Sequence, residues 1–354
     1  MLLNHRAIIT RPGQPPPRLI IRAVAQQPSE TVPREGDLAG AEDELAWTIL
    51  LAASGHAERV AHAGQLAAFG LTREGGLQPV PRDDDRAVLT WRPGSGWESH
   101  WSDPDPRLPL MDLYLPICSA TTERPMTVGH LGQSLDGFIA THAGESRWVT
   151  GQENLLHMHR LRALTDAVVV GAATVALDDP QLTTRLVEGP NPLRVVLDPG
   201  RRLGDQYRVF NDPSAETLYI CAQSMVDAGP PRVGLAKVVG VDGSADGLDV
   251  HAVMQLLRDR GCTRIFVEGG GVTVSMFLEA NLLDRLHMAI APLLIGDGRP
   301  AIRLRPPAAL GDCVRPRYRV FRMGGDVLFD CELGGDTTTG TAETTAPPSV
   351  TRVI

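Results

Sequence analysis

The sequence lacks three features that would each point to a particular class of protein. Its 354 residues include only five cysteines, and no two of them form a C-x-x-C pair, which argues against a zinc knuckle or a redox dithiol. No apolar run is long enough to span a bilayer, and the N-terminus MLLNHRAIIT has no signal-peptide h-region. Positive charge is in deficit, because the formal net charge is −8, and this disfavours nucleic acid or an anionic membrane as a partner. We therefore expect a cytoplasmic protein with reduced cysteines.

Composition divides the chain into three regions. Residues 1–120 are expected to form a small, mainly helical N-terminal domain whose role the sequence does not indicate. Within it, the Pro- and Arg-rich residues 11–35 predict an extended segment, and Ala-rich runs predict helices at Glu42–Ala53 and Ala57–Phe69. Residues 334–354 are rich in Thr, Gly and Pro and predict a disordered tail.

Between residues 126 and 333, strand-like and helix-like runs alternate, which predicts an α/β fold with a mostly parallel sheet. The expected helices are Glu153–Leu164, Val250–Arg260 and Val272–Ala280. The expected strands are Thr127–Leu131, Phe138–Ala140, Ala167–Val170, Arg194–Leu197, Thr217–Cys221, Lys237–Val241, Arg264–Val267, Arg285–Ala291, Tyr318–Met323 and Val327–Cys331. The last two strands flank a Gly-Gly-Asp turn and predict a hairpin.

The segment TRIFVEGGGVTVSMFLEA carries the clearest functional pattern. A β-branched and aromatic run ends at Glu268, and Gly269, Gly270 and Gly271 then lead into an apolar run of helical length. Glycines permit a close backbone approach to a ligand, and a helix N-terminus favours a phosphate. Glu268 would lie at the carboxyl end of a strand, where open α/β sheets bind ligands. A Gly-rich turn without a ligand is the alternative interpretation.

Three other segments point to the same kind of site. Ser146 and Trp148 lie two residues apart in an extended loop, so they can form one wall for a flat heterocycle; alternatively, Trp148 caps the core. Arg162, in the last turn of an expected helix, either caps the helix dipole or reaches a substrate phosphate. The third segment follows the strand at Val168–Val170, and its candidate residues for phosphate and ribose are Gly171, Thr174, Asp178 and Arg185. We expect these segments to converge on one cleft.

Two metal-like patterns are rejected. His56-Ala57-Glu58 matches the first half of the zinc deaminase signature, but the P-C-x-x-C half is missing. His157 and His159 are two residues apart on a helix, so they face different directions and cannot share a metal ion. We expect these two histidines to be solvated or at a domain surface, and no metal site is predicted.

Taken together, residues 126–333 resemble the pyrimidine reductase of riboflavin biosynthesis, the C-terminal half of bifunctional RibD proteins. The motifs that carry the resemblance are SLDG (Ser134–Gly137), GESRW (Gly144–Trp148), LRA (Leu161–Ala163), VVVGAATVALDDPQLTTR (Val168–Arg185), NPLRVVLD (Asn191–Asp198), VEGGG (Val267–Gly271) and APLLIGDG (Ala291–Gly298). The resemblance implies a dihydrofolate-reductase-like sheet with helices on both faces.

The resemblance also implies a reaction and its site residues. NADPH would donate hydride to a 5-amino-6-(5-phosphoribosylamino)uracil-type substrate, whose ribosyl chain becomes ribityl, and the protein would be a homodimer. The implied substrate contacts are Ser146, Arg162, Leu182, Arg185 and Glu268. The implied cofactor contacts are Trp148, Gly171, Thr174, Asp178, Gly269, Gly270, Gly271, Val272 and Thr273. The candidate catalytic residues are Glu268, Asp178 and His130.

The sequence departs from the family pattern at three places. His130 stands where many members carry a lysine near the reduced carbon, and Pro199 replaces a small hydroxyl residue that touches the cofactor. Arg201 and Arg202 are nearby candidates for the adenosine 2′-phosphate. The N-terminal region lacks the zinc ligands of the deaminase domain that usually precedes the reductase, so deamination is not expected.

Three functions remain open at this point. The favoured one is an NADPH-dependent reductase of riboflavin biosynthesis. The second is a related reductase that acts on another pterin- or pyrimidine-like compound, which the His130 position favours. The third is a protein that senses a nucleotide on the same fold without catalysis.

Overall fold

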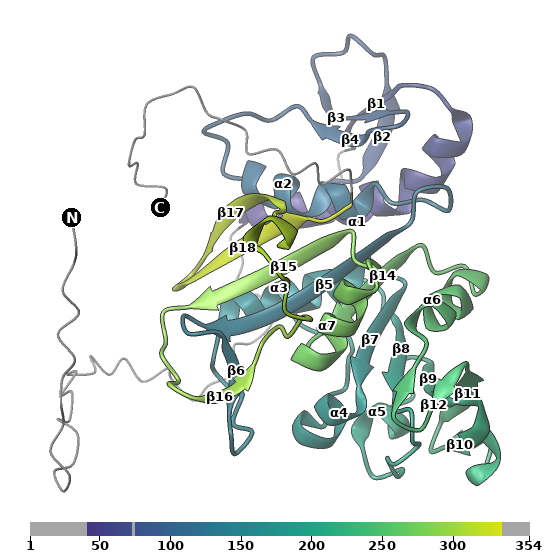
Figure 1. The fold of residues 1–354 in the computed structure, drawn as a ribbon. Helices are drawn as coiled ribbons and strands as arrows, with labels where there is room; N and C mark the ends of the chain where they lie inside the picture. Colours follow the sequence, from purple (N-terminus) through teal and green to yellow (C-terminus); the bar gives the residue numbers. More distant parts are fainter. Residues whose placement is uncertain (1–40, 73–74, 335–354) are drawn as a thin grey trace, which may run out of the picture. The chain divides into compact units, whose positions relative to one another are not determined.

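A ten-stranded mixed sheet lies at the centre of the part of the chain that the computed structural model describes, residues 41–72 and 75–334 (Figure 1). Across the sheet the strands are β10 (Arg232–Val233), β11 (Ala236–Val241), β9 (Thr217–Ala222), β8 (Leu193–Leu197), β7 (Ala167–Gly171), β14 (Arg264–Glu268), β5 (Met126–Ser134), β15 (Arg285–Ala291), β18 (Asp326–Glu332) and β17 (Arg317–Met323). Neighbours from β11 to β15 run parallel, whereas β10, β18 and β17 pair antiparallel. The predicted segment 11–35 and the predicted tail beyond residue 334 lie outside the described residues.

Helices cover both faces of the sheet, as predicted. The central strands are runs of β-branched residues that are buried on both faces, such as β7 (AVVVG) and β14 (RIFVE). Because side chains alternate along a strand, Phe266 joins the core beneath α3 (Gln152–Leu164). Val267 points the other way, into the core beneath α6 (Val250–Asp259) and α7 (Gly271–Glu279). In the described residues no helix is both long and apolar enough to cross a membrane.

Shorter elements join the main strands. A two-stranded pair, β6 with β16, lies beside the sheet. The bounds of the short elements are β6 (Phe138–Thr141), α4 (Ala172–Asp178), α5 (Arg208–Asn211), η1 (Gln223–Ala228), β12 (Gly243–Ser244), β13 (Gly247–Leu248), β16 (Gly298–Pro300) and η2 (Leu310–Asp312). The strands and helices predicted for residues 126–333 are confirmed with small shifts at their ends, as is the β17–β18 hairpin.

The N-terminal region differs from its prediction. One helix, α1 (Ala41–Ala63), replaces the two predicted helices, because Ala53, Ala57 and Val60 continue a single buried stripe. The prediction of a helix reaching Phe69 is wrong, since β1 begins at Ala67. Helix remains the larger part of the regular structure in this region, but the region also contains an antiparallel sheet in the order β2-β1-β3-β4, which was not predicted. These elements are β1 (Ala67–Leu71), β2 (Leu77–Val80), β3 (Ala87–Arg92), β4 (Gly96–Ser99) and α2 (Leu108–Cys118).

The N-terminal region shares a hydrophobic core with the main sheet. Side chains of α1 and α2 belong to the same buried cluster as Phe266 and the inner side of α3. Arg264, at the start of β14, adds polar ties: its guanidinium donates to the hydroxyl and carbonyl of Ser54 (2.7 and 2.9 Å) and to the carbonyl of Ala120 (3.2 Å). The described part of the N-terminal region, which begins at α1, and the main sheet lie in one compact unit.

A chain of buried polar side chains crosses this shared core. The Tyr114 hydroxyl lies 2.6 Å from Nδ1 of His157, and Nε2 of His157 lies 3.0 Å from Nδ1 of His287. Nε2 of His287 lies 3.3 Å from the Asp330 carboxylate. His157 and His159 are 1 % and 0 % exposed, so they are not solvated, whereas the alternative of a domain surface holds for His157, which contacts Tyr114 where α3 meets the N-terminal region. The N-terminal region covers the face of α3 that the sequence alone would leave to solvent.

These buried imidazoles make folding stability depend on pH. Burial lowers the pKa of His130 from 6.5 to about 4, and it lowers the pKa of His157 and of His287 as well. As pH falls, the unfolded chain binds protons at these imidazoles before the folded chain does. The free energy of unfolding that they contribute is therefore fully present above about pH 6.5 and decreases toward pH 4. The decrease is up to about 1.4 kcal/mol per pH unit for each imidazole.

Denaturant unfolding at a series of pH values measures this slope. The substitution His130→Gln is expected to reduce it, whereas His251→Gln, on the exposed side of α6, leaves it unchanged. Stability that stays constant between neutral pH and pH 5 would contradict this account.

Candidate active site

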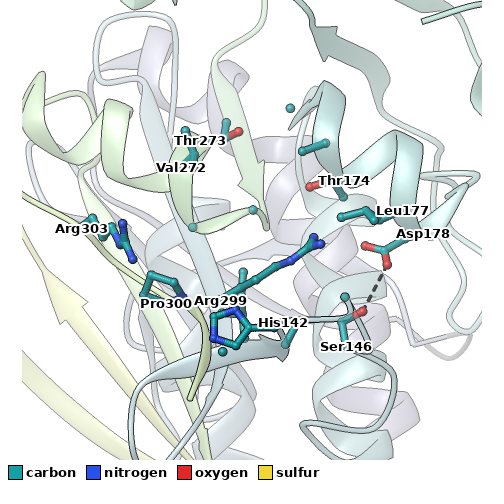
Figure 2. Close-up of a pocket in the computed structure, with 18 residues that line it drawn as sticks. His142, Ser146, Thr174, Leu177, Asp178, Val272, Thr273, Arg299, Pro300 and Arg303 are labelled. Carbon is teal, nitrogen blue, oxygen red and sulfur yellow. Dashed lines mark hydrogen bonds between the residues drawn. The ribbon is translucent and has the colours of Figure 1, made fainter. Parts of the chain in front are cut away.

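A pocket of about 470 Å³ opens at the carboxyl ends of β7 and β14 (Figure 2). Its walls come from β6 and the loop after it, one side of α4 along its whole length, the start of α7, and β16 with the residues after it. The pocket brings together the predicted residues Ser146, Gly171, Thr174, Asp178, Gly270, Gly271, Val272 and Thr273. Of the four segments that were predicted to converge, three line this pocket, and the segment that carries Arg162 does not.

The glycine-rich turn is shaped mainly by the protein itself. Gly269 and Gly270 have φ values of 63° and 74°, a left-handed conformation that glycine adopts without strain. A Cβ on Gly271 would overlap the carbonyl oxygens of Pro300 and Ala301, so this glycine is required by a neighbouring backbone rather than by a ligand. The first turn of α7 has no side-chain cap, and Val272 there is 76 % exposed. The backbone N–H groups of this first turn of α7 therefore remain available to bind an anion.

Acidic and basic side chains face each other across the pocket. Ser146 donates to Asp178 over 3.2 Å, and burial raises the pKa of the Asp178 carboxyl. Arg299 extends across the opening toward Asp178, which it influences electrostatically (Figure 2). Within the described residues neither Arg299 nor Arg303 has a side-chain hydrogen bond or an ion pair. Two unpaired guanidiniums thus border a pocket that also contains a helix start.

A second polar cluster adjoins the pocket. Arg162 forms a two-pronged ion pair with Glu268, at 2.7 and 2.5 Å, and both side chains are almost fully buried. Arg185 is exposed at the surface, but desolvation of its guanidinium by the surrounding protein, followed by the nearby Arg162, lowers its pKa. Glu268 acts electrostatically on both Arg185 and Asp178, which places the cluster beside the pocket. Two guanidiniums against one carboxylate leave an excess positive charge.

The segment that carries Arg185 is held by α3. Arg162 donates to the carbonyl of Thr183 over 3.1 Å, and Nδ1 of His159 accepts from the backbone N–H of Arg185 at 3.1 Å. Burial, followed by Arg162 and Arg185, lowers the pKa of His159 to about 3, so this imidazole is a neutral acceptor. Arg162 therefore braces Glu268 and this segment, and its contact with a substrate phosphate stays a prediction.

Several predicted site residues do not line the pocket. Trp148 is 46 % exposed, which excludes the interpretation that it caps the core. Leu182 is fully buried among apolar side chains, and Gly269 also lies outside the lining. His130 is buried on the α3 face of β5, with Nε2 at 2.9 Å from Oδ1 of Asn154. The fold thus keeps the His130 imidazole away from the pocket.

The sequence analysis missed Arg299 and Arg303 and selected Arg201 and Arg202 instead. Arg201 donates to carbonyl groups of the η1 segment, and Arg202 pairs with Asp198 at 3.0 Å; neither lines the pocket. Arg299 directly follows the APLLIGDG motif, so a basic residue at the end of that motif could have marked it as a candidate site residue. In residues 41–72 and 75–334 no group of three His, Cys, Asp or Glu side chains can hold a metal ion.

Comparison with known proteins identifies the family. The model of the RibD C-terminal domain matches residues 126–315, which contain every segment that lines the pocket. The chain belongs to this family. The RibD C-terminal match begins where β5 begins, so the N-terminal region precedes it.

Curated relatives support this assignment. The 2,5-diamino-6-ribosylamino-4(3H)-pyrimidinone 5′-phosphate reductase of Methanothermobacter thermautotrophicus is 34% identical over 222 residues, covering 60% of this chain and 100% of the relative. The riboflavin biosynthesis protein RibD of Aquifex aeolicus is 33% identical over 179 residues, covering 50% of this chain and 49% of the relative. The chain thus spans about half the length of this RibD protein. RibD of Acinetobacter baumannii shares the fold, with a TM-score of 0.50, 24% identity and coverage of 64% of this chain and 62% of that one.

The Arg162–Glu268 pair generates a stability prediction. The substitution Glu268→Gln leaves the buried Arg162 without a counter-charge, and we expect it to lower the free energy of unfolding by roughly 3–5 kcal/mol. The control is Glu216→Gln, which removes an exposed pair with Lys237 and should cost less than about 1 kcal/mol. Urea unfolding measures both; equal losses would contradict the importance of the buried pair.

Proposed function

We propose that this protein is an NADPH-dependent reductase of riboflavin biosynthesis that converts the ribosyl chain of a phosphorylated ribosylamino-pyrimidine to a ribityl chain. The family membership and the reductase relatives support the reaction class. The observation that carries the proposal is the pocket at the ends of β7 and β14, where a helix start and two unpaired guanidiniums meet. A dinucleotide needs such a combination for its phosphates.

The pocket residues fit a nicotinamide dinucleotide. The N–H groups at the start of α7 and the guanidiniums of Arg299 and Arg303 can receive phosphate oxygens. Thr174 and Asp178 offer a hydroxyl and a carboxylate for ribose hydroxyls. When bound, NADPH supplies the hydride; the protein positions the reacting carbon and excludes water.

The second cluster fits the phosphorylated substrate. Arg185 provides positive charge for the substrate's phosphate, while Arg162 holds Glu268 in place beside the pocket. Asp178 is an ionisable group in the pocket. Desolvation raises the pKa of its carboxyl, which helps this group to hold a proton. We assign Asp178 to proton handling ahead of His130, which the fold turns toward Asn154.

One observation favours a different substrate within the same reaction class. The position at which many family members carry a lysine is filled by His130, and its imidazole faces α3. An enzyme without a cation there suits a related pterin- or pyrimidine-like compound.

A cytoplasmic location and a homodimer stay predictions of the sequence analysis.

Turnover separates these functions. We expect NADPH oxidation with 5-amino-6-(5-phosphoribosylamino)uracil or its 2-amino analogue. Turnover that appears only with another pterin-like compound would favour the second function. NADPH binding that quenches Trp fluorescence without any turnover would favour a sensing role.

Arg299 generates a binding prediction. The substitution Arg299→Ala is expected to raise the Kd for NADPH roughly tenfold, because a charge-assisted contact with a phosphate is lost. The matched control is Arg305→Ala, since Arg305 lies on the same exposed segment but does not line the pocket. Fluorescence titration measures both variants, and equal Kd values for Arg299→Ala and the wild type would exclude the phosphate role.

A further inference from the structure

The N-terminal region reaches the segment that carries Arg185. Trp47 of α1 is 6 % exposed, and its indole N–H donates to the carbonyl of Glu188 over 2.9 Å. This bond joins two residues that are 141 positions apart in the sequence. The acceptor lies three residues after Arg185, in the same irregular segment between α4 and β8.

Packing around this bond fixes the segment against two helices. A Cβ on Gly189 would lie 2.7 Å from the Cβ of Ala163 on α3 and 3.4 Å from Leu51 on α1. The segment is therefore pressed between α1 and α3, with no room for a larger residue. The Arg160 guanidinium of α3 lies 5.7 Å from the Trp47 ring centre, which ties the two helices together beside it.

The two ends of the segment are held by different parts of the protein. His159 and Arg162 of α3 hold the end at residues 183–185, as described above. Only α1 supplies the side-chain hydrogen bond at Glu188, within the described residues. Arg185 is exposed, and among the described residues its guanidinium makes one hydrogen bond, to the Thr183 hydroxyl at 3.4 Å. Its position depends on how well the segment is held.

We propose that α1 positions the substrate's phosphate-binding segment, with Trp47 as a positioning residue that acts through Glu188 on Arg185. This inference rests on the proposed function, because it assigns the phosphate of the substrate to Arg185. It gives the N-terminal region a role in the reductase reaction. Thr184 closes the segment on itself, because its hydroxyl donates to the carbonyl of Pro190 at 2.9 Å and its backbone N–H donates to Oδ1 of Asn191 at 2.7 Å. The bond from Trp47 ties this closed loop to α1. Without that bond the loop would place the Arg185 guanidinium in more positions and bind the phosphate less tightly.

The substitution Trp47→Phe keeps an aromatic ring and removes the indole N–H. We expect the KM for the phosphorylated substrate to rise about 3- to 10-fold, the range that the loss of one hydrogen bond allows. We expect kcat and the Kd for NADPH to stay within about twofold, because α1 does not reach the pocket. The KM for the dephosphorylated substrate should not change.

Trp97 provides a matched control. It is also 6 % exposed, and its indole N–H donates to the carbonyl of Ala53 over 3.1 Å, entirely within the N-terminal region. Trp97→Phe is expected to destabilise the protein to a similar extent without raising KM. A double-mutant cycle with Arg185→Ala completes the test: Trp47→Phe should add nothing once Arg185 is absent.

The outcomes are distinguishable. A wild-type protein without turnover refutes the proposed function itself. With an active wild type, equal KM values for Trp47→Phe and the wild type, or equal changes in both Trp variants, overturn the positioning role. If Trp47→Phe does not fold, Leu51→Ala loosens the same helix against Gly189 and is measured in its place, with the same KM rise expected and an unchanged KM counting against the proposal.

Discussion

The ion pair between Arg162 and Glu268 fixes the geometry on which the whole site depends. Both side chains are buried, so removing either charge would leave the other unpaired and destabilise the folded state. Glu268 is the last residue of β14, and the turn that leads into α7 follows it directly. Arg162 also holds the carbonyl of Thr183, just before Arg185. One interaction therefore sets the relative positions of the pocket at the ends of β7 and β14 and the neighbouring basic cluster.

That interaction is stable only because α3 is enclosed on both sides. The main sheet covers one side of α3, and the N-terminal region covers much of the other, so even its histidines and arginines are buried. Hydrogen bonds compensate for this burial, as in the chain from Tyr114 through His157 to His287. The N-terminal region is thus part of the structural basis of the site, although the family match begins after it.

The sequence predicted what depends on local pattern and missed what depends on tertiary contacts. Central strands such as β7 and β14 were recognisable because parallel strands buried on both faces are continuous β-branched runs. β1, with the sequence AAFGL, shows no strand pattern. It forms a strand because of its neighbours in the sheet and the packing of Phe69 against Trp97, and neither can be read from the local sequence. In the site, the glycine-rich turn and Asp178 were found from the motifs. The place of Arg299 in the pocket was not, because it depends on β6 and β16 pairing beside the pocket.

The close contact at Gly271 has a consequence for ligand entry. The start of α7 touches the backbone of Pro300 and Ala301 without intervening side chains, so these two walls cannot part without breaking main-chain packing. A ligand entering the pocket therefore meets a fixed wall on the side of α7 and β16.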